Sequence, residues 1–139
     1  MPSFVGSFKM FDVWFYIGVF DYQQQRVKTK SCVTLARSLG KRVVRQRDLA
    51  YSFHTLPEFR NICAHDERLY CARVGKRADK GFPELLRAFE PVVERSMLVA
   101  YVGEVASLLD GVRSESPEIA EKLLQGMQVH ECDFNRYLD

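Results

Sequence analysis

The sequence has no hydrophobic run long enough to cross a membrane. The longest run near its start, residues 13–20, holds eight residues, whereas a spanning helix needs roughly 20. The start also lacks a basic stretch followed by a small-residue cleavage site, which is the pattern of a secretory signal peptide. We therefore expect a cytoplasmic protein without a membrane partner.

Glycine and proline are scarce, with eight Gly and five Pro among 139 residues. So few helix breakers favour long helices over many short strands. Apolar residues make up 47% of the chain and charged residues 27%, as in an ordinary soluble domain. Apolar positions recur at helical intervals over most of the sequence. The pattern predicts an all-α bundle of about five helices.

The first half of the chain contains three predicted helical stretches. The aromatic-rich residues 8–22 predict a first helix. Residues 31–39 predict a second helix, ended by Gly40 in the left-handed conformation. A longer stretch, 43–70, is interrupted by Pro57, which removes a backbone donor. We expect a kink or a new helix there, with residues 58–70 on the first turns of that new helix.

Residues 72–80 are basic and predict a loop. The apolar stripe that follows, 82–108, predicts one helix, with a kink at Pro91 and an end at Gly111. The last helix is expected to open at 116–118, where a capping serine precedes a first-turn proline and an acidic residue.

The four cysteines are scattered and form no Cys-x-x-Cys pattern. Free thiols in a reducing compartment are therefore expected. A zinc site built from Cys63, His65, His130 and Cys132 is the alternative. In a helix, however, side chains two residues apart point about 200° away from each other. Because Cys63 and His65 would then face in different directions, we expect no metal site there. We also expect no cofactor.

No acidic residue occurs from Gln23 to Arg47, although the net charge of the whole chain is only +2. A local block of positive charge suits a polyanion such as RNA. A solvated helix face is the alternative explanation. Within this block we expect RNA contacts from Arg42, Arg45 and Arg47. The cations of the block are Arg26, Lys28, Lys30, Arg37, Lys41, Arg42, Arg45 and Arg47.

Chemically useful side chains concentrate in residues 59–70. His65 titrates near neutrality and can move protons. Arg60 offers a planar charged fork that matches phosphate oxygens. Asn61 can orient either group through hydrogen bonds. Together they suit metal-free RNA cleavage, in which the 2′-OH attacks the neighbouring phosphate.

Helical spacing does not aim Arg60 and His65 at one atom. In an ideal helix they lie about 140° apart, whereas Asn61, His65 and Arg68 share one face. The pair can converge if the turn is distorted, or if a second copy of the helix faces the first. The alternative is that these are ordinary surface residues or that His65 belongs to the core.

The string Arg-Asn-Ile-Cys-Ala-His-x-x-Arg-Leu-Tyr, residues 60–70, resembles the motif of abortive-infection (Abi) proteins of the AbiD/AbiF-like group. Its Arg-x4-His core is similar to the signature of HEPN ribonucleases. The resemblance covers roughly residues 4–112, including the apolar helix opened by 81–83.

The resemblance implies a HEPN-like helical bundle, active as a homodimer in which two Arg-x4-His motifs meet. By position, Arg60 and His65 would be the catalytic pair, Asn61 their polar companion and Arg68 an RNA-binding support. The implied function is an endoribonuclease of phage defence, held in check by a protein or RNA antitoxin. A non-catalytic module that binds RNA or protein is the alternative, and a purely structural dimer is a third. Residues 1–139 are expected to form one such domain, or the C-terminal part of a longer Abi-type architecture.

Overall fold

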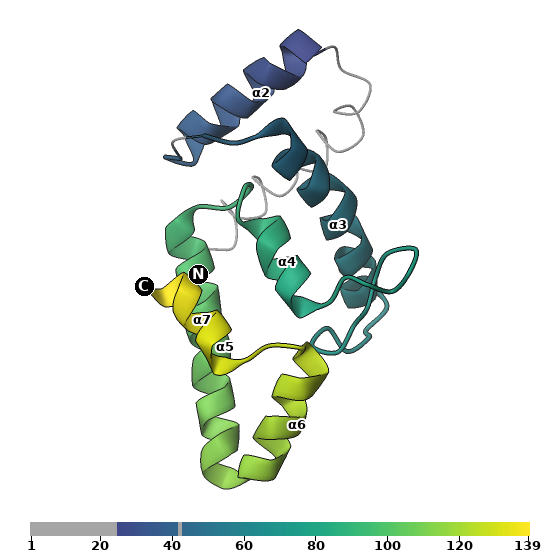
Figure 1. Cartoon of the computed structure of the whole chain (residues 1–139), viewed down its shortest axis with the longest axis vertical. Coiled ribbons are helices and arrows are strands. Elements are labelled where there is room, and N and C mark those ends of the chain that lie inside the picture. Colours follow the sequence, from purple (N-terminus) through teal and green to yellow (C-terminus); the bar gives the residue numbers. More distant parts are fainter. Residues whose placement is uncertain (1–24, 42) are drawn as a thin grey trace.

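The computed structural model describes residues 25–41 and 43–139 of the chain, and all the regular secondary structure in these ranges is helical (Figure 1). The all-α class is thus confirmed, although the described ranges hold six helices rather than about five. The helix expected over 8–22 lies outside the described residues. The six helices are α2 (Gln25–Ser38), α3 (Gln46–Ala64), α4 (Phe82–Phe89), α5 (Arg95–Glu115), α6 (Pro117–Met127) and α7 (Glu131–Leu138).

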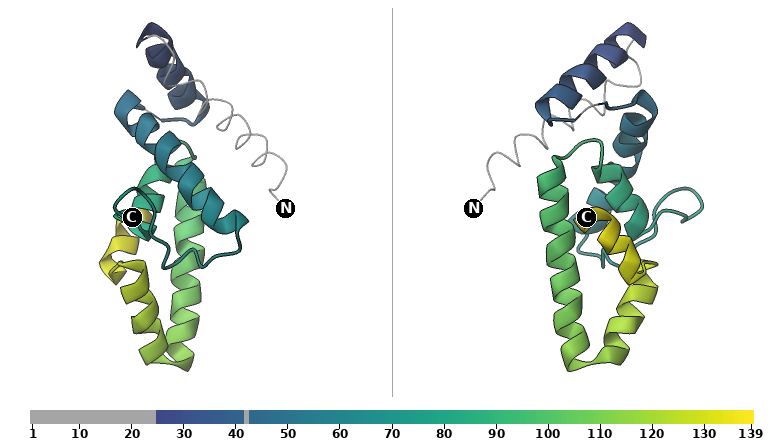
Figure 2. Two further views of the ribbon diagram at one scale, coloured as in Figure 1. Left: turned by 90° about the vertical axis from the view of Figure 1, so that its right-hand side faces the viewer. Right: turned by 60° about the vertical axis from the view of Figure 1, so that its left-hand side comes forward.

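The helices pack chiefly as two groups. Helix α3 packs against α4, and α5 packs against both α6 and α7. Figure 2 shows α5 and α6 as an antiparallel hairpin, with α7 folding back along α5. Helix α2 contacts α3 and projects beyond the other helices (Figures 1 and 2). One continuous set of buried apolar side chains, from Cys32 to Tyr137, joins the two groups.

Helix α3 runs through Pro57 without ending, which corrects the expectation of a new helix there. Thr55, two residues before Pro57, is fully buried, and its hydroxyl accepts a hydrogen bond from Lys80 Nζ at 3.1 Å. Proline costs α3 one backbone hydrogen bond. Burial of Phe59 and Leu49, each only 2% exposed, opposes that loss by holding both halves of α3 against the core.

Helix α2 ends as the sequence predicts. Gly40 is left-handed, with φ of 63°, and its N–H donates to the Arg37 carbonyl. The N–H of Lys41 donates to the Ala36 carbonyl, which completes a Schellman motif. Helix α6 ends in the same way, but at Gln128 (φ 58°), and glutamine is not a residue type that predicts the end of a helix.

The stripe over 82–108 forms two helices rather than one. Helix α4 ends at Phe89, since Pro91 cannot donate a backbone hydrogen bond to continue it. Helix α5 begins at Arg95 and continues through Gly111 to Glu115, so the expected end at Gly111 is wrong. The predicted opening of α6 is confirmed, with Pro117 in the first turn. Helix α7 was not predicted.

The segment between α3 and α4 is a loop, as expected for 72–80. Val74 and Lys80 pair across it in an isolated antiparallel bridge. Lys80 also lies 3.8 Å from Glu58 and 5.3 Å from the ring centroid of Tyr51. These contacts tie the loop to the middle of α3.

Candidate functional site

The C-terminal end of α3 carries the residues of the Arg-x4-His motif. Arg60 and Asn61 lie in its last two turns, and His65 is the residue at which the helix ends. All three are solvent-exposed. The alternative that His65 belongs to the core is therefore wrong, and a ligand or a second chain can reach the motif.

A Schellman motif stops α3 just after Ala64. The N–H of Asp66 donates to the Cys63 carbonyl at 3.2 Å, and the N–H of Glu67 donates to the Ile62 carbonyl at 3.1 Å. Asp66 supplies the left-handed residue, with φ of 58°. Aspartate occupies this conformation more readily than most residues because its short side chain bonds locally.

Because the helix stops there, Arg68 does not share a helical face with Asn61 and His65, and that expectation is wrong. Arg68 lies exposed in the loop that follows. Its carbonyl accepts a weak hydrogen bond from the Cys71 thiol at 3.9 Å. Any contribution of Arg68 to binding must therefore come from the loop rather than from α3.

Within one chain, no hydrogen bond links the side chains of the expected catalytic pair, Arg60 and His65. The guanidinium Nη1 of Arg60 lies 3.5 Å from Oδ1 of Asn61, at the outer limit of a hydrogen bond. No hydrogen bond joins the side chains of Arg60 and His65, both of which lie in the described ranges.

The basic residues expected to bind RNA lie at the opposite end of α3. Arg45 precedes its first residue, and Arg47 lies in its first turn, largely exposed and 3.9 Å from Asp48. Arg42 lies outside the described residues. At a rise of 1.5 Å per residue, Arg45 and Arg60 are about 22 Å apart along the helix. The sequence-predicted residues thus form two groups rather than one site.

A cleft of about 740 Å³ opens beside Arg45. Its walls come from the 39–45 loop, α3, the ends of α4 and α7, and the start of α5. Three of its cations, Arg87, Arg95 and Arg136, are distant in sequence from the basic block. No local sequence pattern links these three residues, because only the tertiary fold brings them together.

Burial shifts the pKa of three groups that line this cleft, Tyr137, Tyr51 and Lys41, and the pKa of Tyr51 rises although Arg87 opposes the shift. Burial raises the pKa of Tyr137 to about 12, with a further rise from the carboxylate of Glu90 and their hydrogen bond. It lowers the pKa of Lys41, although Glu90 opposes that shift and Arg95 adds to it. The cleft is therefore a partly desolvated place in which positive charge lies close to positive charge.

Among the described residues, no three His, Cys, Asp or Glu side chains gather into a group able to hold a metal ion. Cys63, Cys71 and Cys132 are exposed free thiols, and Cys32 is a buried one whose pKa is raised by burial. None of the helices from α2 to α7 is both long and apolar enough to cross a membrane.

Comparison with family models, with curated proteins and with solved structures gives no match to this chain. The resemblance to HEPN and Abi proteins therefore rests on the motif over 60–70.

Proposed function

We propose that the protein is a metal-independent endoribonuclease of an abortive-infection or toxin–antitoxin system. Its site would form where two copies of the chain meet, each supplying Arg60 and His65. The observation that carries this proposal is the exposure of Arg60, Asn61 and His65 together at the end of one helix. An antitoxin would act by covering this end of α3.

The chemistry uses only these side chains and the RNA. The imidazole of one His65 takes the proton from the 2′-OH as the O2′–P bond forms. The P–O5′ bond breaks, and the protonated imidazole of the same His65 returns its proton, directly or through water, to O5′. Arg60 binds the non-bridging phosphate oxygens and neutralises the charge that develops on them. The products are a 2′,3′-cyclic phosphate and a 5′-hydroxyl.

An apolar stripe on α5 supports assembly into a dimer. Met97 is 48% exposed and Leu108 is 72% exposed. Eleven residues apart, they lie within about 20° of each other around the helix. Tyr101 lies between them, close enough to Cys63 for the thiol to affect its pKa, which is raised chiefly by burial. Exposed apolar surface marks interfaces. If two copies of the chain packed together along this stripe, the end of α3 would lie near the second copy.

A second candidate function is a non-catalytic module that binds RNA or protein. The separation of Arg60 from His65 within one chain favours it, because a lone chain shows no assembled acid–base site. The cationic cleft near Arg45 also favours binding, and it does not depend on cleavage.

Incubation of the pure protein with mixed RNA in EDTA tests the proposal. We expect cleavage that leaves 2′,3′-cyclic phosphate ends, whereas DNA, which lacks the 2′-OH, survives. His65→Ala should reduce the rate by about 10²- to 10⁴-fold, the usual contribution of a positioned proton carrier. Because His65 is exposed, this variant should keep the thermal stability of the parent protein.

His54 provides the matched control, since it is also an exposed histidine of α3 but lies outside the motif. His54→Ala should cleave at the parent rate. Cleavage that stops in EDTA, or equal losses in both variants, would contradict the proposal.

A further inference from the structure

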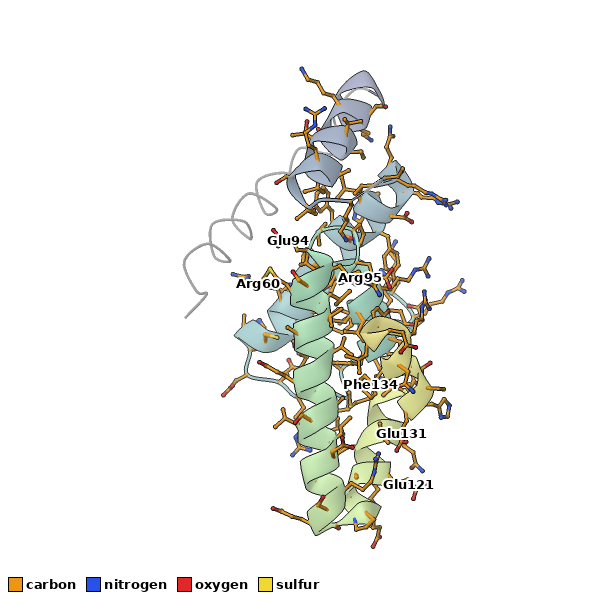
Figure 3. All side chains as sticks on the ribbon, turned by 90° about the vertical axis from the view of Figure 1, so that its left-hand side faces the viewer. Arg60, Glu94, Arg95, Glu121, Glu131 and Phe134 are labelled. Carbon is orange, nitrogen blue, oxygen red and sulfur yellow. The ribbon has the colours of Figure 1, made fainter. Side chains whose placement is uncertain are left out.

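The cleft beside the start of α3 collects positive charge from four separate segments. Lys41 and Arg45 come from the α2–α3 loop, Arg87 from α4, Arg95 from α5 and Arg136 from α7. Its volume of about 740 Å³ falls within the range of small-molecule sites, roughly 300–1,000 Å³. Figure 3 shows Arg95 at the start of α5, on the other side of this helix from Arg60.

Among the residues that the structure describes, carboxylates do not balance the positive charge of the cleft. Five cations face only two carboxylates, Asp48 and Glu90. Glu90 is already hydrogen-bonded to Tyr137. Asp48 has its own neighbour in Arg47, 3.9 Å away. Within residues 25–41 and 43–139, none of the five cations of the cleft forms an ion pair.

Aromatic rings lie beside two of the guanidinium groups. The Cζ of Arg87 is 4.9 Å from the ring centroid of Tyr51, and that of Arg136 is 5.8 Å from the ring centroid of Tyr137. Such stacking limits the freedom of a guanidinium and leaves its edge N–H donors available. Planar donors held in this way suit tetrahedral oxyanions, above all phosphate.

Burial lowers the pKa of Lys41, and Arg95 adds to this shift although Glu90 opposes it, so positive charge at this point of the cleft is unfavourable. A bound anion would remove this cost and would be attracted to every wall of the cleft at once. A monovalent counter-ion neutralises less of this positive charge than a group with several negative charges does, because such a group can contact three or more of the cations together.

We propose that this cleft is a binding site for phosphate groups, supplied either by a free nucleotide or by a strand of RNA. No residue of the Arg60–His65 motif lines it, so the inference does not rest on the proposed cleavage. The guanidinium groups of Arg95 and Arg136 would hold phosphate oxygens, and Arg87 would contribute from its stacked position on Tyr51.

Calorimetric titration of the full chain in EDTA tests this inference, with tripolyphosphate, ATP, adenosine and a short single-stranded RNA as probes. We expect the phosphate-bearing probes to bind and adenosine not to bind. If only RNA binds, the phosphates belong to a strand; if ATP or tripolyphosphate also binds, the cleft accepts a free ligand. Binding by no phosphate-bearing probe, or equal binding by adenosine and ATP, would overturn the proposal.

Two charge-reversed variants distinguish binding in the cleft from nonspecific electrostatic attraction to the protein. Arg95→Glu with Arg136→Glu changes two exposed side chains of the cleft, and we expect affinity to fall at least about tenfold. Lys76→Glu with Arg77→Glu makes the same change in net charge in the exposed 75–79 loop, outside the cleft. Equal losses in the two variants would overturn the proposal. Arg95→Gln with Arg136→Gln, which adds no negative charge, should still show the loss while the melting temperature is unchanged.

Discussion

Tyr137 is a buried tyrosine whose phenol is hydrogen-bonded to Glu90. Burial, followed by the nearby carboxylate, raises its pKa from an ordinary value of 10.0 to about 12. In the unfolded chain the phenol therefore loses its proton first. Between pH 10 and pH 12 the folded state holds more protons than the unfolded state, so the free energy of unfolding must fall as the pH rises through this window.

We expect Tyr137→Phe to remove this dependence. Below pH 10 the variant should be less stable than the parent by about 1 kcal/mol, the typical contribution of one hydrogen bond. Above pH 10 the difference between the two proteins should narrow, because only the parent loses the contribution of this phenol. Urea unfolding at pH 9 and pH 11.5 measures the difference in the free energy of unfolding between the two proteins. A difference that stays constant across these conditions would show that Tyr137 titrates normally.

The side chains of the Arg-x4-His motif could be identified from residue types, because guanidinium, amide and imidazole groups have known chemistry. Their relative placement could be predicted only in part. The ideal-helix angle of about 140° between Arg60 and His65 agrees with the absence of a hydrogen bond between them in the described chain. The position of Arg68 could not be predicted, since it depends on where the backbone leaves α3.

At the scale of whole elements, the exits from helices differ in how plainly the sequence marks them. Gly40 announces the end of α2 because glycine adopts positive φ without steric cost. Asp66 and Gln128 perform the same role at the ends of α3 and α6, yet neither residue type marks a stop. For this reason the sequence pattern predicts a longer α3 than the structure has.

Pro57 and Pro91 also show that residue type alone does not determine where a helix ends. Both remove a backbone donor, but α3 continues through Pro57 and α4 ends before Pro91. Buried side chains flank both prolines, Leu56 and Phe59 at Pro57 and Ala88 and Val92 at Pro91, so burial beside the proline does not account for the difference.

Asp66→Gly should stabilise the protein. A non-glycine residue in the left-handed region costs roughly 1 kcal/mol, and glycine removes that cost at the turn that follows His65. The melting temperature should rise by about 3 °C for a chain of this size. Asp66→Ala is the control, because alanine keeps the cost and loses the local hydrogen bonding of aspartate. Thermal unfolding followed by circular dichroism compares the three proteins, and a rise in the alanine variant would contradict this account of the turn.

For the molecule as a whole, α3 separates two chemically different regions. The Arg-x4-His motif lies at one end, and the cationic cleft lies beside the other. An RNA strand that reached both would be held by its phosphates at the cleft and presented to the motif about 22 Å away. The two proposals can nevertheless fail separately, because reversing charges in the cleft alters binding while His65→Ala alters only the chemical step.

Assembly of the cleavage site from two chains is the central claim, and mixing two inactive variants tests it most directly. In a symmetric dimer whose sites each take Arg60 from one chain and His65 from the other, a mixed dimer of Arg60→Ala and His65→Ala contains one site with both residues intact. Equimolar mixing makes half of the dimers mixed, with one working site of two.

The measurement is the rate of RNA cleavage in EDTA by each variant alone and by the refolded mixture. The account predicts that each variant alone is nearly inactive and that the mixture recovers about a quarter of the parent rate. A mixture as inactive as its components, although light scattering shows it to be dimeric, would contradict the claim that the site is shared between chains.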